Sequence, residues 1–170
     1  MPTLNSIQRT IRRVRQIEEA ATSLPHDLME LVIPEELVKS HDGEVFLKYD
    51  SGPGSNRILI FSTRRALDWL EMGDVLLSDG TFSVVPDLFS QLYTFHSYKD
   101  GQSIPCFFAL TKNRTENTYN ELLTFLKREK PAYFPRLFVS DYEQAIRNAI
   151  TTGFPTTTIH GCFFHFSQAI

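Results

Sequence analysis

Residues 75–110 constrain the fold of this 170-residue chain more than any other stretch. The stretch, VLLSDGTFSVVPDLFSQLYTFHSYKDGQSIPCFFAL, contains three runs rich in apolar and β-branched residues, and turn-forming Pro, Asp and Gly residues separate these runs. Short runs of this composition between turn signals are typical of β-strands. The spacing therefore predicts three consecutive antiparallel strands, over 75–85, 91–98 and 103–110.

Asp79 lies inside the first of these predicted strands. Asp is disfavoured in strands, and burying a carboxylate without a partner costs several kcal/mol. Asp79 therefore either faces solvent or has a positive charge against it.

The composition is that of a single globular domain, with 42% hydrophobic and 22% charged residues. The net charge of −3 argues against binding to nucleic acid through overall charge and leaves room for a local basic stripe. Two cysteines without a Cys-rich spacing favour a reducing compartment. Because no stretch approaches the roughly 18 apolar residues of a membrane span, we expect a soluble intracellular protein with no membrane partner.

Residues 6–22 have the apolar spacing of an amphipathic helix whose front half is basic and includes Arg9, Arg12 and Arg13. This half is either an arm that contacts phosphates or a solvated helix face, and the pattern alone does not decide between them.

Local patterns predict the other elements and hence the fold class. Residues 136–140 form a short apolar run without alternation, which is typical of a buried, central, parallel strand. The prediction is an α/β fold with a mixed sheet: a three-strand antiparallel meander, then helix, strand, helix, strand. We divide the chain into a lead-in at 1–73, with a basic helix and a hairpin, and a core at 74–170. The remaining predicted elements are strands over 44–50 and 57–63, a helix over 64–71 closed by Gly73, helices over 115–130 and 142–150, and a strand over 156–164.

Asp141 follows the predicted buried strand and precedes a helix, which is where open α/β sheets build ligand sites. If the first and fourth core strands are neighbours, Asp79 and Asp141 lie side by side. Two carboxylates in one cleft repel each other, and a divalent cation relieves that repulsion. Mg²⁺ keeps positions open for water and phosphate oxygens, so this pair suits phosphoryl chemistry. The alternative is that Asp79 faces solvent and Asp141 is the N-cap of the next helix.

Cys162 and His165 form a C-x-x-H sequence. A structural zinc site needs four ligands, and Cys106 and His160 are not spaced as a partner motif, so zinc is not expected. The alternative is a buried thiol beside an imidazole at the edge of the core.

Four motifs in order, DGTFSVVPDLFSQLYTFH, IPCFFAL, SDYEQAI and GCFFHFSQAI, make residues from about Ser78 to Ile170 resemble the Mutator-like element (MULE) transposase domain. The resemblance implies a ribonuclease-H-like fold and DNA cleavage and strand transfer by an Asp, Asp, Glu triad with two Mg²⁺ or Mn²⁺ ions. It implies double-stranded transposon-end DNA as partner and the nucleus as location, and it leaves room for a homo-oligomer. The first two catalytic, metal-binding acids correspond to Asp79 and Asp141. The family's C-x-x-H motif corresponds to Cys162 and His165. We expect these two residues to contact DNA or to have a structural role, and the same expectation applies to the basic residues Arg9, Arg12 and Arg13.

Two departures from the family pattern qualify this expectation. The third acid belongs on a helix after the last predicted strand, and neither Glu116 nor Glu143 lies where it could replace that acid. The zinc-containing DNA-recognition domain of the family is also absent upstream. The sequence therefore predicts a C-terminally truncated catalytic core. The alternative is a non-catalytic, transposon-derived module that binds DNA or protein.

Overall fold

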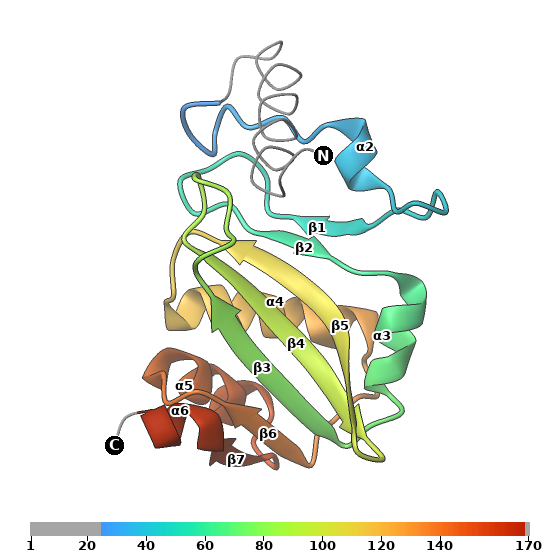
Figure 1. Ribbon diagram of the computed structural model, residues 1–170, viewed down its shortest axis with the longest axis vertical. Helices are drawn as coiled ribbons and strands as arrows, with labels where there is room; N and C mark the ends of the chain where they lie inside the picture. The colour runs from blue at the N-terminus through green and yellow to red at the C-terminus, as the bar shows by residue number, and fades with distance from the viewer. Residues whose placement is uncertain (1–24, 169–170) are drawn as a thin grey trace, which may run out of the picture.

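The computed structural model describes residues 25–168, so the predicted helix at 6–22 with Arg9, Arg12 and Arg13 lies outside the described residues. The described chain is an α/β fold with one mixed seven-stranded sheet in the order β1-β2-β5-β4-β3-β6-β7 and five helices (Figure 1). The strands are β1 (Leu47–Asp50), β2 (Leu59–Phe61), β3 (Val75–Thr81), β4 (Gln91–Lys99), β5 (Gln102–Thr111), β6 (Leu137–Ser140) and β7 (Thr158–Gly161). The helices are α2 (Glu35–Val38), α3 (Arg64–Leu70), α4 (Glu116–Glu129), α5 (Gln144–Gly153) and α6 (Phe163–Gln168).

The predicted meander is confirmed, because β3 pairs antiparallel with β4 and β4 pairs antiparallel with β5. Asp100 and Gly101 both have positive φ, of 51° and 79°, in the two-residue turn between β4 and β5. An Asp-Gly pair suits this turn because glycine adopts positive φ without strain and Asp tolerates it. β3 ends at Thr81 rather than at residue 85, and the chain then forms a loop up to β4.

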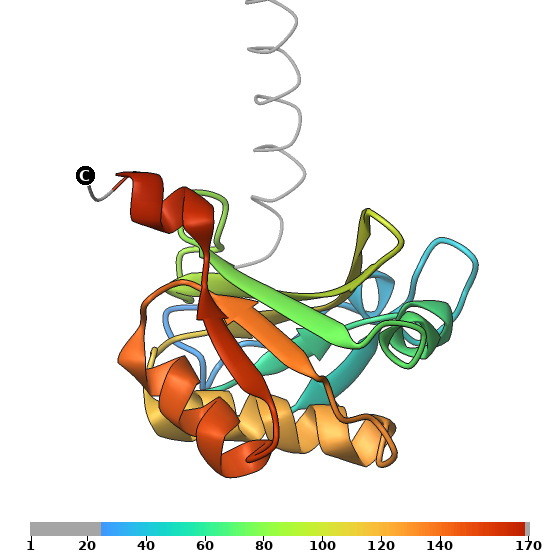
Figure 2. The ribbon, with the colours of Figure 1, turned by 90° about the horizontal axis from the view of Figure 1, so that it is seen from below.

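The predicted central position of the fourth core strand is also confirmed, because β6 pairs in parallel with β3 on one side and with β7 on the other. Helices α4 and α5 lie together on one side of the sheet, and α6 lies on the other side (Figure 2). The main hydrophobic core fills the space between the sheet and α4 and α5, and its largest fully buried rings include Tyr93, Phe95, Phe107, Tyr119 and Phe125.

Two further local predictions were wrong. The last strand ends at Gly161 rather than at residue 164, because its partner β6 ends at Ser140, which pairs with Gly161. Residues 163–168 then turn into α6. Gly73 does not close α3, whose C-cap is Glu71. A Cβ at Gly73 would lie 2.8 Å from the carbonyl oxygen of Tyr98, so this glycine allows close contact with β4.

The hairpin β1–β2 joins the same sheet, since β2 pairs antiparallel with β5. A second hydrophobic cluster, around Leu28, Leu59 and Phe89, covers the sheet here on the face opposite to the main core. Arg57 connects the segment around Leu31 to the β1–β2 hairpin. Its Nε donates to Asp50 Oδ1 at 2.8 Å, and its Nη1 donates to the carbonyl oxygen of Leu31 at 2.6 Å. The Arg57 side chain is 6% exposed.

We expect Arg57→Ala to lower the free energy of unfolding by about 3 kcal/mol, because it removes the ion-pair partner of Asp50 and the donor to the backbone carbonyls of Leu28 and Leu31. Urea unfolding followed by circular dichroism measures the loss. Arg136→Ala is the control, because its ion pair with Asp74 is exposed on both sides. An equal loss in the two variants would contradict a special role for Arg57.

Candidate functional site

The structure places Asp79 in β3 and Asp141 directly after the neighbouring strand β6. The parallel register of β3 and β6 pairs Val75 with Leu137 and Leu77 with Val139. Asp79 and Asp141 each lie two residues beyond the last of these pairs, Asp79 within β3 and Asp141 directly after β6. The parallel pairing therefore brings residues more than sixty positions apart in the sequence to the same end of two neighbouring strands.

The alternation of burial along the strands indicates the face that carries Asp79. Ser78 and Ser140 are buried toward the face that α4 and α5 cover, whereas Leu77 and Val139 are half-buried. Successive side chains of a strand point to opposite faces. Asp79 therefore belongs to the open face, on the same side of the sheet as α6 (Figure 2). Asp141 directly follows β6 and is half-buried.

Asp79 is exposed on this face, with 56% of its side chain accessible. Of the two alternatives for Asp79, the solvent-facing one is therefore correct. Because the Asp79 carboxylate is not buried, its position in the strand does not require a cation beside it. The N-cap reading of Asp141 is wrong, since the N-cap of α5 is Glu143.

Each aspartate uses one oxygen locally and leaves the other available. Asp79 Oδ1 accepts a hydrogen bond from the Gly80 backbone N–H at 2.9 Å, and Asp141 Oδ1 accepts one from the Glu143 N–H at 3.2 Å. Within residues 25–168, no donor reaches Oδ2 of either aspartate. Two carboxylate oxygens at the end of adjoining strands are thus available to a hard cation.

His165 lies at the same site. It projects from α6, and its Nε2 is 3.8 Å from Asp79 Oδ1. Cys162 is partly buried, and its backbone N–H donates to the Ser140 carbonyl at 2.6 Å. Burial raises the pKa of the Cys106 thiol to about 11, which leaves it protonated and unreactive at neutral pH. In the part of the chain that the structure describes, no three His, Cys, Asp or Glu side chains are grouped to hold a metal ion.

The sequence interpretation missed the residues beneath the acids. Glu143 Oε2 accepts a hydrogen bond from the Tyr119 hydroxyl at 2.9 Å, and the Tyr93 hydroxyl lies 2.8 Å from Ser78 Oγ. Burial raises the pKa of Glu143, the Tyr119 hydrogen bond opposes this rise, and the Asp141 charge adds to it. Burial also raises the pKa of both tyrosines. The spacing of α4 marks Tyr119 as a core residue, but no sequence signal names the partner of its hydroxyl.

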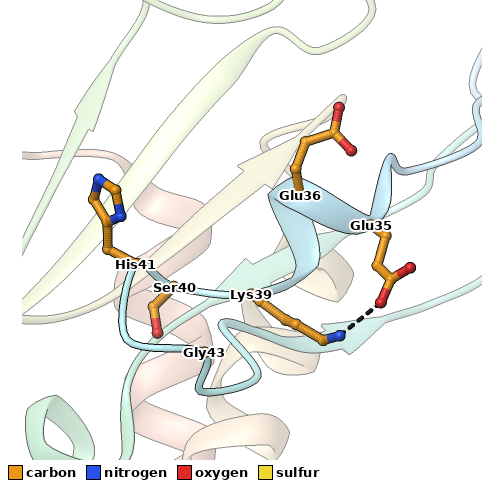
Figure 3. Close-up of a pocket in the computed structure, with 6 residues that line it drawn as sticks. All are labelled: Glu35, Glu36, Lys39, Ser40, His41 and Gly43. Carbon is orange, nitrogen blue, oxygen red and sulfur yellow. Dashed lines mark hydrogen bonds and ion pairs between the residues drawn. The ribbon is translucent and has the colours of Figure 1, made fainter.

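A cavity of about 730 Å³ lies away from these acids, beside α2 and the turn that follows it. Its lining residues all come from 35–43, and Lys39 Nζ pairs with Glu35 Oε1 at 2.6 Å (Figure 3). None of them belongs to β3, β6 or α6, so this cavity takes no part in the site.

The fold and the site define an α/β protein with a mixed sheet, in which one aspartate lies in β3 and another directly follows the adjoining parallel strand β6. The MULE transposase domain family matches residues 75–169, more than half of the chain, and the chain belongs to this family. No curated protein matches the chain. Among solved structures, the chain is similar to the Drosophila P element transposase strand transfer complex, with 13% identity and a TM-score of 0.37. That similarity covers 64% of this chain and 32% of the other, so the chain spans about a third of that transposase's length. Of the helices in residues 25–168, none combines the length and hydropathy that a membrane span requires.

Proposed function

We propose that this chain carries the metal-binding part of a MULE-type transposase core, which cleaves DNA and transfers its strands. The observation that carries this proposal is that Asp79 and Asp141 each follow the last pair of the parallel strands β3 and β6, Leu77 and Val139, by two residues. Membership of the MULE transposase domain family supports it.

The fold we propose for residues 74–170 is ribonuclease-H-like, with residues 1–73 as its lead-in. The strand order β5-β4-β3-β6-β7 supports this assignment, as do the antiparallel pairing of β3, β4 and β5 and the parallel pairing of β6 and β7. This is the arrangement expected of a meander followed by helix, strand, helix, strand.

The two carboxylates suit Mg²⁺ or Mn²⁺ as ligands. These cations prefer oxygen ligands, and Mg²⁺ is commonly held by one or two carboxylates, with water and phosphate oxygens filling the other positions. Asp79 and Asp141 would supply those carboxylates. A bound divalent cation makes an attacking water or 3′-hydroxyl more acidic and neutralises charge on the phosphate.

We propose double-stranded transposon-end DNA as the substrate, which implies action in the nucleus. His165 lies beside Asp79, where a protonated imidazole can donate to a phosphate oxygen. Arg9, Arg12 and Arg13 would contact the DNA backbone, and assembly of two or more copies on paired DNA ends is part of this proposal.

The second candidate is a module that binds DNA or protein without cleaving DNA. One observation favours it: within the described residues, no group of three or more His, Cys, Asp or Glu side chains is arranged to hold a metal ion. The pair of aspartates would hold a metal ion only weakly.

Plasmid nicking separates the two candidates. The purified chain is incubated with supercoiled plasmid in Mn²⁺, in Mg²⁺ or in EDTA, and nicked product is measured on agarose gels. The catalytic proposal expects nicking in Mn²⁺ or Mg²⁺ and none in EDTA. A retarded plasmid without nicking supports the non-catalytic module. If the plasmid is neither nicked nor retarded, the result contradicts a DNA function for this chain.

A further inference from the structure

A chain of hydrogen bonds links α4 to Asp141. The Tyr119 hydroxyl donates to Glu143 Oε2 at 2.9 Å, and the Glu143 backbone N–H donates to Asp141 Oδ1 at 3.2 Å. Tyr119 is fully buried in the middle of the main core, so its hydroxyl has a fixed position. Asp141 thus has a defined connection to a rigid helix on the other side of the sheet.

The same tyrosine also contacts the residues beneath Asp79. Its ring packs against Tyr93, with ring centroids 5.0 Å apart, and the Tyr93 hydroxyl lies 2.8 Å from Oγ of Ser78, the residue before Asp79. Gln91 Nε2 donates to the Tyr119 hydroxyl at 3.4 Å, and a Cβ on Gly80 would lie 3.3 Å from Cδ of Gln91. Tyr119 therefore contacts Glu143 directly, and it connects to β3, which carries Asp79, through Tyr93 and Gln91 of β4.

We infer that Tyr119 and Glu143 are positioning residues, which hold the Asp141 carboxylate at a fixed place relative to Asp79. The inference rests on the proposed function of the two aspartates as a metal-binding pair. Neither Tyr119 nor Glu143 is required to touch the metal ion or the DNA.

The local structure explains why Asp141 needs this support. It lies just past β6, where the ladder of backbone hydrogen bonds to β3 has ended. The N-cap of α5 makes no side-chain capping hydrogen bond, so the side chain of Glu143 is available to Tyr119. Residues that orient a metal ligand typically change metal affinity by about 10-fold to 100-fold when removed.

Three variants of the full chain test the inference. Tyr119→Phe removes the donor, and Glu143→Ala removes the acceptor. Glu143→Gln keeps an oxygen that can accept from Tyr119 while removing the charge. We expect the first two variants to weaken Mn²⁺ binding about 10-fold or more, measured by calorimetry, and Glu143→Gln to bind within about 2-fold of the unmodified chain.

A second measurement reports the position of Asp141 without any metal. Hydrogen exchange of the backbone amide at position 143, followed by NMR, reports the bond to Asp141 Oδ1. We expect Tyr119→Phe and Glu143→Ala to speed this exchange about 10-fold, and Glu143→Gln to leave it unchanged. Asn148→Ala is the matched control: Asn148 Nδ2 donates to Glu116 Oε2 at 3.0 Å, so this variant also loses a contact between α4 and α5, with no link to either aspartate.

Each outcome separates this inference from the proposed function. If Glu143→Gln weakens Mn²⁺ binding as much as Glu143→Ala, Glu143 acts through its charge and the positioning role is wrong. Unchanged exchange and unchanged Mn²⁺ affinity in Tyr119→Phe would also overturn the inference. If exchange changes as expected but the unmodified chain binds no Mn²⁺, the positioning stands and the metal-binding function fails.

Discussion

Asp141→Asn is expected to reduce Mn²⁺-dependent plasmid nicking by about 100-fold or more, and Asp79→Asn by a similar factor. Asparagine keeps the shape of the side chain and one acceptor oxygen for the local N–H bond. It removes the negative charge that attracts a divalent cation. The loss should therefore appear without a change in fold.

Two measurements check this result. Initial nicking rates are compared at saturating Mn²⁺, and calorimetry measures whether each variant binds Mn²⁺ more weakly. Asp74→Asn is the matched control, since Asp74 is an exposed acid just before β3, paired with Arg136 by an ion pair of 2.8 Å. Its nicking rate and Mn²⁺ affinity should match those of the unmodified chain. Full activity in Asp79→Asn or Asp141→Asn would exclude the pair as the metal site.

Phe107→Ala is expected to lower the free energy of unfolding by about 3–5 kcal/mol and the melting temperature by roughly 10 °C. Phe107 is fully buried in β5. Its ring stacks on Phe95 with centroids 4.4 Å apart and meets the edge of Phe125 of α4 at 5.5 Å. Truncation removes this apolar contact and leaves a cavity between the sheet and α4.

Urea unfolding followed by tryptophan fluorescence measures the loss in Phe107→Ala. Phe163→Ala is the control, because the Phe163 side chain is 79% exposed on α6 and its removal creates no cavity. A comparable loss in the two variants would mean that the stability of the fold does not depend on the aromatic core between β5 and α4.

Local sequence predicted much of the fold because its signals are local. The Asp100-Gly101 pair specifies a tight turn, and the apolar spacing and terminal charges of residues 115–130 specify α4. Element ends were less predictable. The end of β7 depends on where β6 ends, and Gly73 is required by contact with β4, so both depend on partners far away in the sequence.

The candidate site likewise has a part that could be predicted from the sequence and a part that could not. The acids themselves could be named from the sequence, because Asp79 interrupts an apolar strand and Asp141 follows one. Their surroundings could not: the exposure of Asp79, the approach of His165 and the bond between Tyr119 and Glu143 all require the packed structure.

By itself the sequence determined the meander and the order of strands and helices in the core, because hydrophobic periodicity and turn residues act over a few positions. Tertiary structure alone decided that Asp79 is exposed on the open face and that the Tyr119 hydroxyl donates to Glu143. The reason is that parallel pairing of β3 with β6 and the packing of α4 join residues whose separation along the chain carries no local signal.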